Sequence, residues 1–325
     1  MRMAWPGWKK LVKPAIKTAL GLIVLWAVGR HVLRTWSDLH KPGRSLHVEP
    51  LWMILAGLLY LAGLLICGYF FGQVLKNTQT PVSVRLAIRA YVISHLGKYV
   101  PGKAMVVVMR VGMVVPHGVR ASTAAIATFF ETLVMMAAGS IVAVIGFSLA
   151  PRPLQLTPIA LSLGLTACFL TIVDPFMFPR ASRLITRSLP TKIGPEAYPV
   201  VDRRLLVRGL AYSTLAWLLF GLSQVAVVRA VASAGVGLGL WPLVIASVAL
   251  ATVAGFVVAV LPGGLGIREG VIMTTLAPAI GQDTAVVAAL ALRLTWVITE
   301  ATAAGILAVL PLTRPLPTTS GKLEP

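Results

Sequence analysis

Six ionisable side chains lie within apolar stretches of the sequence, three of them acids and three of them arginines. They are Arg110, Glu131, Arg268, Glu269, Arg293 and Glu300. A charged side chain in hydrocarbon costs at least about 2.5 kcal/mol, so such residues face a protein interior and pair with one another. We expect five of them, all except Arg110, to face one interior cavity that binds a polar cargo, with Glu131 as the partner of Arg293. The alternative is that they form purely structural ion pairs.

Two Pro-Gly breaks interrupt the apolar sequence close to these charges. The first reads Lys-Tyr-Val-Pro-Gly-Lys at 98–103, and the second reads Leu-Pro-Gly-Gly-Leu-Gly-Ile-Arg-Glu-Gly at 261–270. Unwound backbone inside a membrane must be buried in protein or line a cavity. Broken helices of this kind form the cargo sites of membrane transporters. The sequence therefore predicts a membrane protein that handles a polar or charged cargo.

The second break is suited to binding an anion. The backbone N–H groups of Gly263, Gly264 and Gly266 precede the start of a helix, where the helix dipole favours negative charge. Basic side chains flank both breaks: Lys98, Lys103, Arg110 and Arg268. We expect an anionic headgroup, in particular a lipid phosphate, to bind between the breaks. Tight helix packing is the alternative reason for each glycine cluster.

The composition places these residues in an all-α polytopic membrane protein. The chain is 57% hydrophobic and 12% charged, with a mean hydropathy of +0.86, whereas soluble domains carry about 25% charged residues. Several apolar runs exceed the length of about 20 residues that spans a bilayer. The formal charge of +19 comes from basic residues between these runs, as positive-inside bias and anionic lipid headgroups would require. We expect no nucleic-acid partner.

The sequence carries none of the motifs that would indicate an enzyme. It has no Ser/His/Asp grouping, paired catalytic carboxylates, Walker A segment or dinucleotide fingerprint, and its two cysteines lack metal-binding spacing. We therefore expect no catalytic activity, no cofactor and no metal. The lack of a nucleotide motif also argues against an ATP-driven pump.

Segment length and the placement of basic loops predict the topology. We expect six full spans, at 15–28, 51–75, 121–149, 156–173, 206–231 and 284–310. The segments 84–115 and 241–281 contain the two breaks, and we expect them to be re-entrant helical hairpins. With this assignment both termini are cytoplasmic.

The predicted topology contains an inverted repeat. The units 51–149 and 206–310 each consist of a span, a hairpin and a span, in opposite orientations. The two breaks then approach the membrane midplane from opposite faces, as in many transporters. The alternative is a chance pattern, because Pro and Gly are frequent in membrane helices. We expect a single integral membrane domain over 1–320 and a disordered tail at 321–325.

The chain resembles the flippase-like membrane-domain family, which comprises the transmembrane portion of lysylphosphatidylglycerol synthases and its stand-alone relatives. The matching segments are 95–103 through Arg110, the break at 261–270, and Arg293-Leu294, and the similarity covers roughly 50–310. The resemblance implies a role in moving modified phospholipids between leaflets. Other relatives accompany isoprenoid-linked sugars, glycosyltransferases or hopanoid pathways. The sequence has no soluble aminoacyl-transferase domain, so the resemblance does not imply synthase activity.

Three functions remain open at the level of the sequence. The leading hypothesis is a flippase-like protein of the cell inner (plasma) membrane that moves a phospholipid or isoprenoid-linked lipid between leaflets. The second is a membrane partner of a glycosyltransferase or lipid-modifying enzyme that transports nothing itself. The third is a small-ion or proton-coupled secondary transporter. A polar cavity with a headgroup path favours the first, and a sealed, ion-paired interior favours the second.

Overall fold

The computed structural model is helical throughout the part of the chain that it describes. That part comprises Trp26, Arg30 and residues 48–78, 82–100, 104–151, 156–187, 201–232, 237–258 and 266–311. The predicted first span, both Pro-Gly dipeptides and the predicted tail at 321–325 lie outside it, apart from Trp26 at the end of that span.

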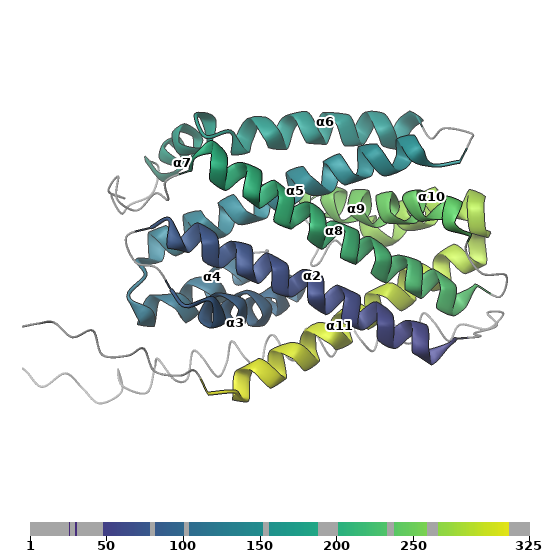
Figure 1. Ribbon diagram of the computed structural model, residues 1–325, viewed down its shortest axis with the longest axis horizontal. Helices are drawn as coiled ribbons and strands as arrows, with labels where there is room; N and C mark the ends of the chain where they lie inside the picture. The colour runs from purple at the N-terminus through teal and green to yellow at the C-terminus, as the bar shows by residue number, and fades with distance from the viewer. Residues whose placement is uncertain are drawn as a thin grey trace, which may run out of the picture.

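Five long helices run along the length of the molecule (Figure 1). They are α2 (Pro50–Lys76), α5 (Ala121–Leu149), α6 (Leu156–Val173), α8 (Arg203–Val231) and α11 (Gln282–Val309). Each forms around a long apolar run of the sequence, although α8 and α11 also carry charged residues such as Arg229 and Glu300. Asp202 begins α8 as an N-cap, because its Oδ1 accepts a hydrogen bond from the Leu205 N–H at 2.6 Å. These bounds confirm the predicted spans 2 to 6 to within a turn.

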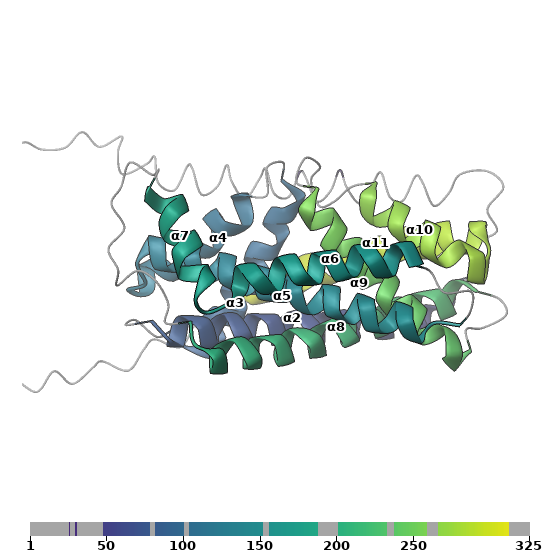
Figure 2. The same ribbon diagram turned by 90° about the horizontal axis from the view of Figure 1, so that it is seen from above.

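Two pairs of shorter helices lie at opposite ends of the long helices (Figures 1 and 2). The first pair is α3 (Val84–His95) and α4 (Ala104–Val114), with the 3-10 turn η1 (Leu96–Tyr99) at the end of α3. The second pair is α9 (Trp241–Val257) and α10 (Ile267–Ile280). Each pair returns to the end of the bundle from which it starts, as a re-entrant hairpin must. Re-entrant insertion itself stays a prediction.

Six helices among the described residues are long and apolar enough to cross a membrane. Five are the long helices, and the sixth is the segment Leu238–Val257, which contains α9. From the sequence we expect the residues from 241 onward in the second hairpin, and 15–28 as one of the six spans instead. The chain is therefore a multi-pass membrane protein, and α9 is long enough for a full span although its partner α10 is not.

Small residues let the long helices approach closely around the interior. A Cβ atom at Gly139 of α5 would lie 2.6 Å from the Trp217 ring of α8, and one at Gly63 of α2 would lie 2.4 Å from the Phe220 ring. The Trp217 Nε1 donates a hydrogen bond to the Met135 carbonyl at 2.7 Å. These contacts fix aromatic side chains from α8 at the wall of the central cavity.

Candidate functional site

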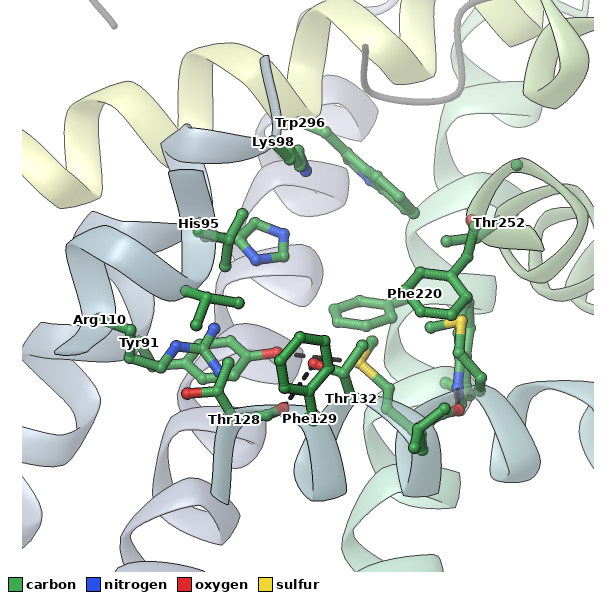
Figure 3. A pocket seen from close by; sticks show the side chains of 18 of the residues that line it. Tyr91, His95, Lys98, Arg110, Thr128, Phe129, Thr132, Phe220, Thr252 and Trp296 are labelled. Atoms are coloured by element: carbon green, nitrogen blue, oxygen red, sulfur yellow. Dashed lines mark hydrogen bonds between the residues drawn. The ribbon is translucent and has the colours of Figure 1, made fainter. Parts of the chain in front are cut away.

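A cavity of about 390 Å³ lies between the two short helical pairs and the long helices. Its wall combines two kinds of side chain (Figure 3). The basic ones are His95, Lys98, Arg110 and Arg268. The others are mainly apolar or aromatic, and include Phe129, Leu133, Met136, Trp217, Phe220 and Phe256. The cavity is thus amphipathic, with cations beside a surface that suits hydrocarbon.

Arg110 and Glu131 form a fully buried ion pair next to this cavity. The Arg110 Nη1 donates to the Glu131 Oε2 at 2.9 Å, and both side chains are 2% exposed. The Arg110 Nε also donates to the Ser94 Oγ at 3.0 Å. The guanidinium carbon lies 4.2 Å and 4.9 Å from the ring centroids of Tyr91 and Phe71. The ion pair, the hydrogen bond and the two aromatic contacts together offset the hydration that the buried guanidinium has lost.

Four side chains converge on the carboxylate of Glu300, which is 0% exposed on α11. Tyr60 of α2 and Lys98 of η1 both donate to Oε1. The Tyr99 hydroxyl donates to Oε2 at 2.9 Å, and the His95 Nε2 lies 3.7 Å from Oε1. Glu300 therefore connects η1, which lies between α3 and α4, to α2 and α11, beside the first predicted break.

Trp296 lies one turn before Glu300 on α11 and contacts Tyr60, Ser223 and Arg268. Its ring stacks on Tyr60 with centroids 4.1 Å apart and an interplanar angle of 10°. Its Nε1 donates to the Ser223 Oγ at 3.1 Å, which in turn donates to the Ala56 carbonyl at 2.8 Å. The Arg268 guanidinium carbon lies 5.0 Å from the Trp296 ring centroid. Within the described residues, no carboxylate lies within ion-pair distance of Arg268.

Glu269 and Arg293 form the third ion pair. The Arg293 Nη1 donates to the Glu269 Oε1, and each side chain is 13% exposed. The other carboxylate oxygen, Oε2, accepts from the Gly266 N–H at 2.8 Å. Gly266 has a φ of +81°, which favours glycine. Here the backbone donor that was expected to face an anion is already bound by Glu269.

The predicted partner of Glu131 is wrong. We expected Arg293, but Glu131 pairs with Arg110 and Arg293 pairs with Glu269. The reason is geometric: α4 packs on α5 and α10 packs on α11, so each ion pair joins helices that follow each other in the chain.

The structure brings most of the other predicted site residues to the cavity or directly behind its wall. Arg110, Arg268 and Lys98 line the cavity, and Glu131 and Glu300 bind two of these from behind. The Glu269–Arg293 pair is not among the described residues of the wall. Three further predicted residues lie outside the described residues: Lys103, Gly263 and Gly264.

Several residues of the site were missed by sequence reasoning. Tyr60, Ser94 and Trp296 contact the charged groups, yet none of them is a charged residue or part of a Pro-Gly break. Such residues usually belong to the core, so their sequence context carries no signal of a site. Among the described residues there is no group of three or more His, Cys, Asp or Glu side chains that could hold a metal ion.

The fold and the cavity define a polytopic helical membrane protein with an ion-paired, amphipathic interior. The chain matches the family model described as the lysylphosphatidylglycerol synthase TM region over residues 15–303, and it belongs to that family. A comparison with curated proteins gives no match. Membership of this family supports a membrane role related to lipid.

Proposed function

We propose that this protein is a flippase-like translocator of the cell inner (plasma) membrane that moves an anionic lipid between leaflets. The lipid keeps its covalent structure, so the proposal requires transport and no catalysis. The cargo class is a phospholipid or an isoprenoid-linked lipid, because both carry a phosphate on an apolar chain.

The observation that carries this proposal is the mixed character of the cavity wall. Arg268 and Lys98 supply positive charge, while Phe220 and Phe256 supply apolar surface within the same 390 Å³. A small inorganic ion would not need such an apolar wall, and a purely apolar ligand would not need the cations. An anionic amphiphile satisfies both parts.

A widely exposed phenylalanine in the wall supports an opening of the cavity toward the bilayer. Phe129 of α5 lines the cavity and is nevertheless 56% exposed. In a bilayer the exposed side of Phe129 faces hydrocarbon. An acyl or isoprenoid chain can therefore contact Phe129 both from the bilayer and from the cavity. This feature favours a lipid over an ion or a proton as the cargo.

Charge balance indicates how a headgroup would be held. Arg110 and Lys98 each have an acid as partner, whereas Arg268 lies over Trp296 with no acid beside it in the described part of the chain. A phosphate bound at Arg268 would gain a charge-assisted hydrogen bond in a medium of low dielectric. The lipid could also compete with Glu300 for Lys98 and with Glu269 for the Gly266 N–H.

Reconstituted vesicles provide the test. The purified protein should accelerate the movement of a fluorescent anionic phospholipid between leaflets, and Arg268→Gln should abolish most of this activity while folding is retained. Arg85→Gln is the matched control, because Arg85 is an exposed arginine away from the cavity wall. Full lipid movement by folded Arg268→Gln protein would overturn the site assignment, and no movement of this phospholipid or of an isoprenoid-linked phosphate by the parent protein would overturn the function.

The second candidate is a partner protein that binds a glycosyltransferase or lipid-modifying enzyme and transports nothing. The three interior ion pairs favour it, because they hold most interior charges in fixed contacts. This function predicts no lipid movement by the protein alone, together with stable co-purification of a co-expressed membrane enzyme.

A further inference from the structure

The helix α7 (Met177–Arg187) is an amphipathic helix outside the cavity. It lies at the end of the bundle where α6 ends (Figure 2). Its start is fixed by Asp174, whose Oδ1 accepts from the N–H groups of Phe176 at 2.9 Å and Met177 at 3.3 Å. Phe178 anchors it to α5, because its ring meets the Phe130 ring edge-on with centroids 4.9 Å apart.

The outer side of α7 and of the turn before it carries both large apolar residues and arginines. Phe176 is 57% exposed, Met177 is 43% exposed and Leu184 is 67% exposed. Arg180 and Arg183 are also exposed. At 100° per residue, Met177 and Leu184 share one side of the helix and the two arginines share the adjacent side. The guanidinium of Arg180 lies over the Phe176 ring, so cation and apolar surface are neighbours.

This arrangement does not suit water on all sides. Three large apolar side chains in water would be an unfavourable exposed patch, and the same side chains deep in hydrocarbon would carry the arginines with them. A helix at the level of the lipid headgroups satisfies both requirements.

The end of the bundle around α7 is strongly basic. The basic residues here include Lys76 at the end of α2, Arg120 directly before α5, Arg203 and Arg204 at the start of α8, and Arg180 and Arg183 of α7 itself. The described acids at this end are Asp174 and Asp202, and both act as helix caps. This charge is complementary to the negative surface of a leaflet rich in anionic lipid.

We propose that α7 lies in the headgroup layer of the leaflet at the basic end and binds anionic phospholipid. Leu184, Met177 and Phe176 enter the upper acyl region, and Arg180 and Arg183 contact phosphates. The inference does not depend on lipid movement through the cavity, since it concerns only the surface helix.

A fluorophore at position 184 tests both parts of the inference in the full-length protein. The label is attached to Leu184→Cys in a Cys168→Ala background, because Cys168 is exposed and Cys67 is buried. In vesicles we expect the label to be protected from a water-soluble quencher. We also expect stronger quenching by phosphatidylglycerol that carries a nitroxide near the top of one acyl chain than by phosphatidylcholine with the same label at equal mole fraction. A label quenched from water would overturn the membrane location.

Paired arginine variants assign the lipid preference to α7. Arg180→Gln with Arg183→Gln should reduce the local preference for phosphatidylglycerol by about tenfold. Arg203→Gln with Arg204→Gln removes the same charge from exposed positions at the start of α8 and should leave the preference nearly unchanged. Equal quenching by both lipids in the parent protein, or equal loss in both double variants, would overturn anionic lipid binding by α7. Quenching is measured only on variant protein that elutes like the parent protein in size-exclusion chromatography, so that misfolded protein is excluded.

Discussion

The two short helical pairs carry ion pairs at equivalent places, with the signs reversed. Arg110 on α4 pairs with Glu131 on the following long helix α5, and Glu269 on α10 pairs with Arg293 on the following long helix α11. The first pair has side chains that are 2% exposed, whereas those of the second pair are 13% exposed. The ion pair of the first short helical pair is thus fully buried, whereas the ion pair at the same topological position in the second is more accessible to solvent.

The surroundings of the two pairs extend this difference. Arg110 has further partners in Ser94, Tyr91 and Phe71. The residue before Glu269 is Arg268, which lines the cavity. Within the described part of the chain, no carboxylate forms an ion pair with it. We infer that the Arg110–Glu131 ion pair holds the helices together. We also infer that the region of Arg268 and Glu269 exchanges its contacts for contacts with the cargo. The four variants below probe this division, from the largest expected effect to the smallest.

Arg110→Gln should cause the largest loss of stability. It leaves the Glu131 carboxylate buried without a counter-charge, and breaking a buried ion pair in this way costs about 3–5 kcal/mol. The measurement is thermal unfolding in detergent micelles. The double variant Arg110→Gln with Glu131→Gln should recover part of the loss, because no unpaired charge remains. A small loss of stability in the single variant would show that the Arg110–Glu131 ion pair is not shielded from water.

Glu300→Gln should have the next largest effect. The amide keeps one acceptor oxygen for either Tyr60 or Tyr99, which donate to different carboxylate oxygens, and it removes the charge that binds Lys98, so we expect a loss of about 2–3 kcal/mol. The same variant should loosen η1, measured as faster hydrogen exchange at the backbone of Lys98 and Tyr99. Unchanged exchange there would contradict the role of Glu300 as the anchor of the first short pair.

Glu269→Gln should destabilise the protein less than the change at Arg110 does, by about 2 kcal/mol, since its pair is intermediate between a buried and a surface ion pair. The matched comparison is Glu131→Gln in the same unfolding experiment. If the Glu269 variant loses as much stability as the Glu131 variant, the proposed difference between the two halves is wrong.

Gly266→Ala should have the smallest effect, a loss of about 1 kcal/mol from backbone strain at positive φ. A Cβ atom at Gly266 would meet no other atom within 4 Å, so no steric clash adds to the strain. Gly270→Ala is the control, because that glycine lies inside α10, also has open space around it and has no positive φ. We expect it to be neutral or slightly stabilising, and equal losses in the two variants would argue against strain at Gly266.

The sequence was sufficient to predict the class and the long helices. Continuous apolar runs marked α2, α5, α6, α8 and α11, because a membrane helix must be apolar over its whole length. Charges within such runs marked Glu131 and Glu300 as interior residues, and both are buried. These predictions depend on local composition, which a single sequence displays directly.

The partners of the charges could not be predicted in the same way. Glu131 was assigned to Arg293 because the sequence gives the charges but not the helices that pack together. Tyr60 lies 240 residues from Glu300, and their hydrogen bond depends on how α2 and α11 cross. Whether α9 crosses the membrane is likewise not decided by local composition: the segment Leu238–Val257 is long and apolar enough for a span, and its place in a re-entrant hairpin stays a prediction.

Photo-cross-linking from inside the cavity tests the central claim, that an anionic lipid binds there through Arg268. A photoreactive amino acid replaces Thr252, which lines the cavity from α9, and the protein is reconstituted in equal amounts of phosphatidylglycerol and phosphatidylcholine. The account predicts that cross-linked lipid, identified by mass spectrometry, is mainly phosphatidylglycerol, and that Arg268→Gln removes this preference while Arg85→Gln preserves it. Cross-linking of the two lipids in equal amounts by the parent protein, or an unchanged preference in the Arg268 variant, would contradict it.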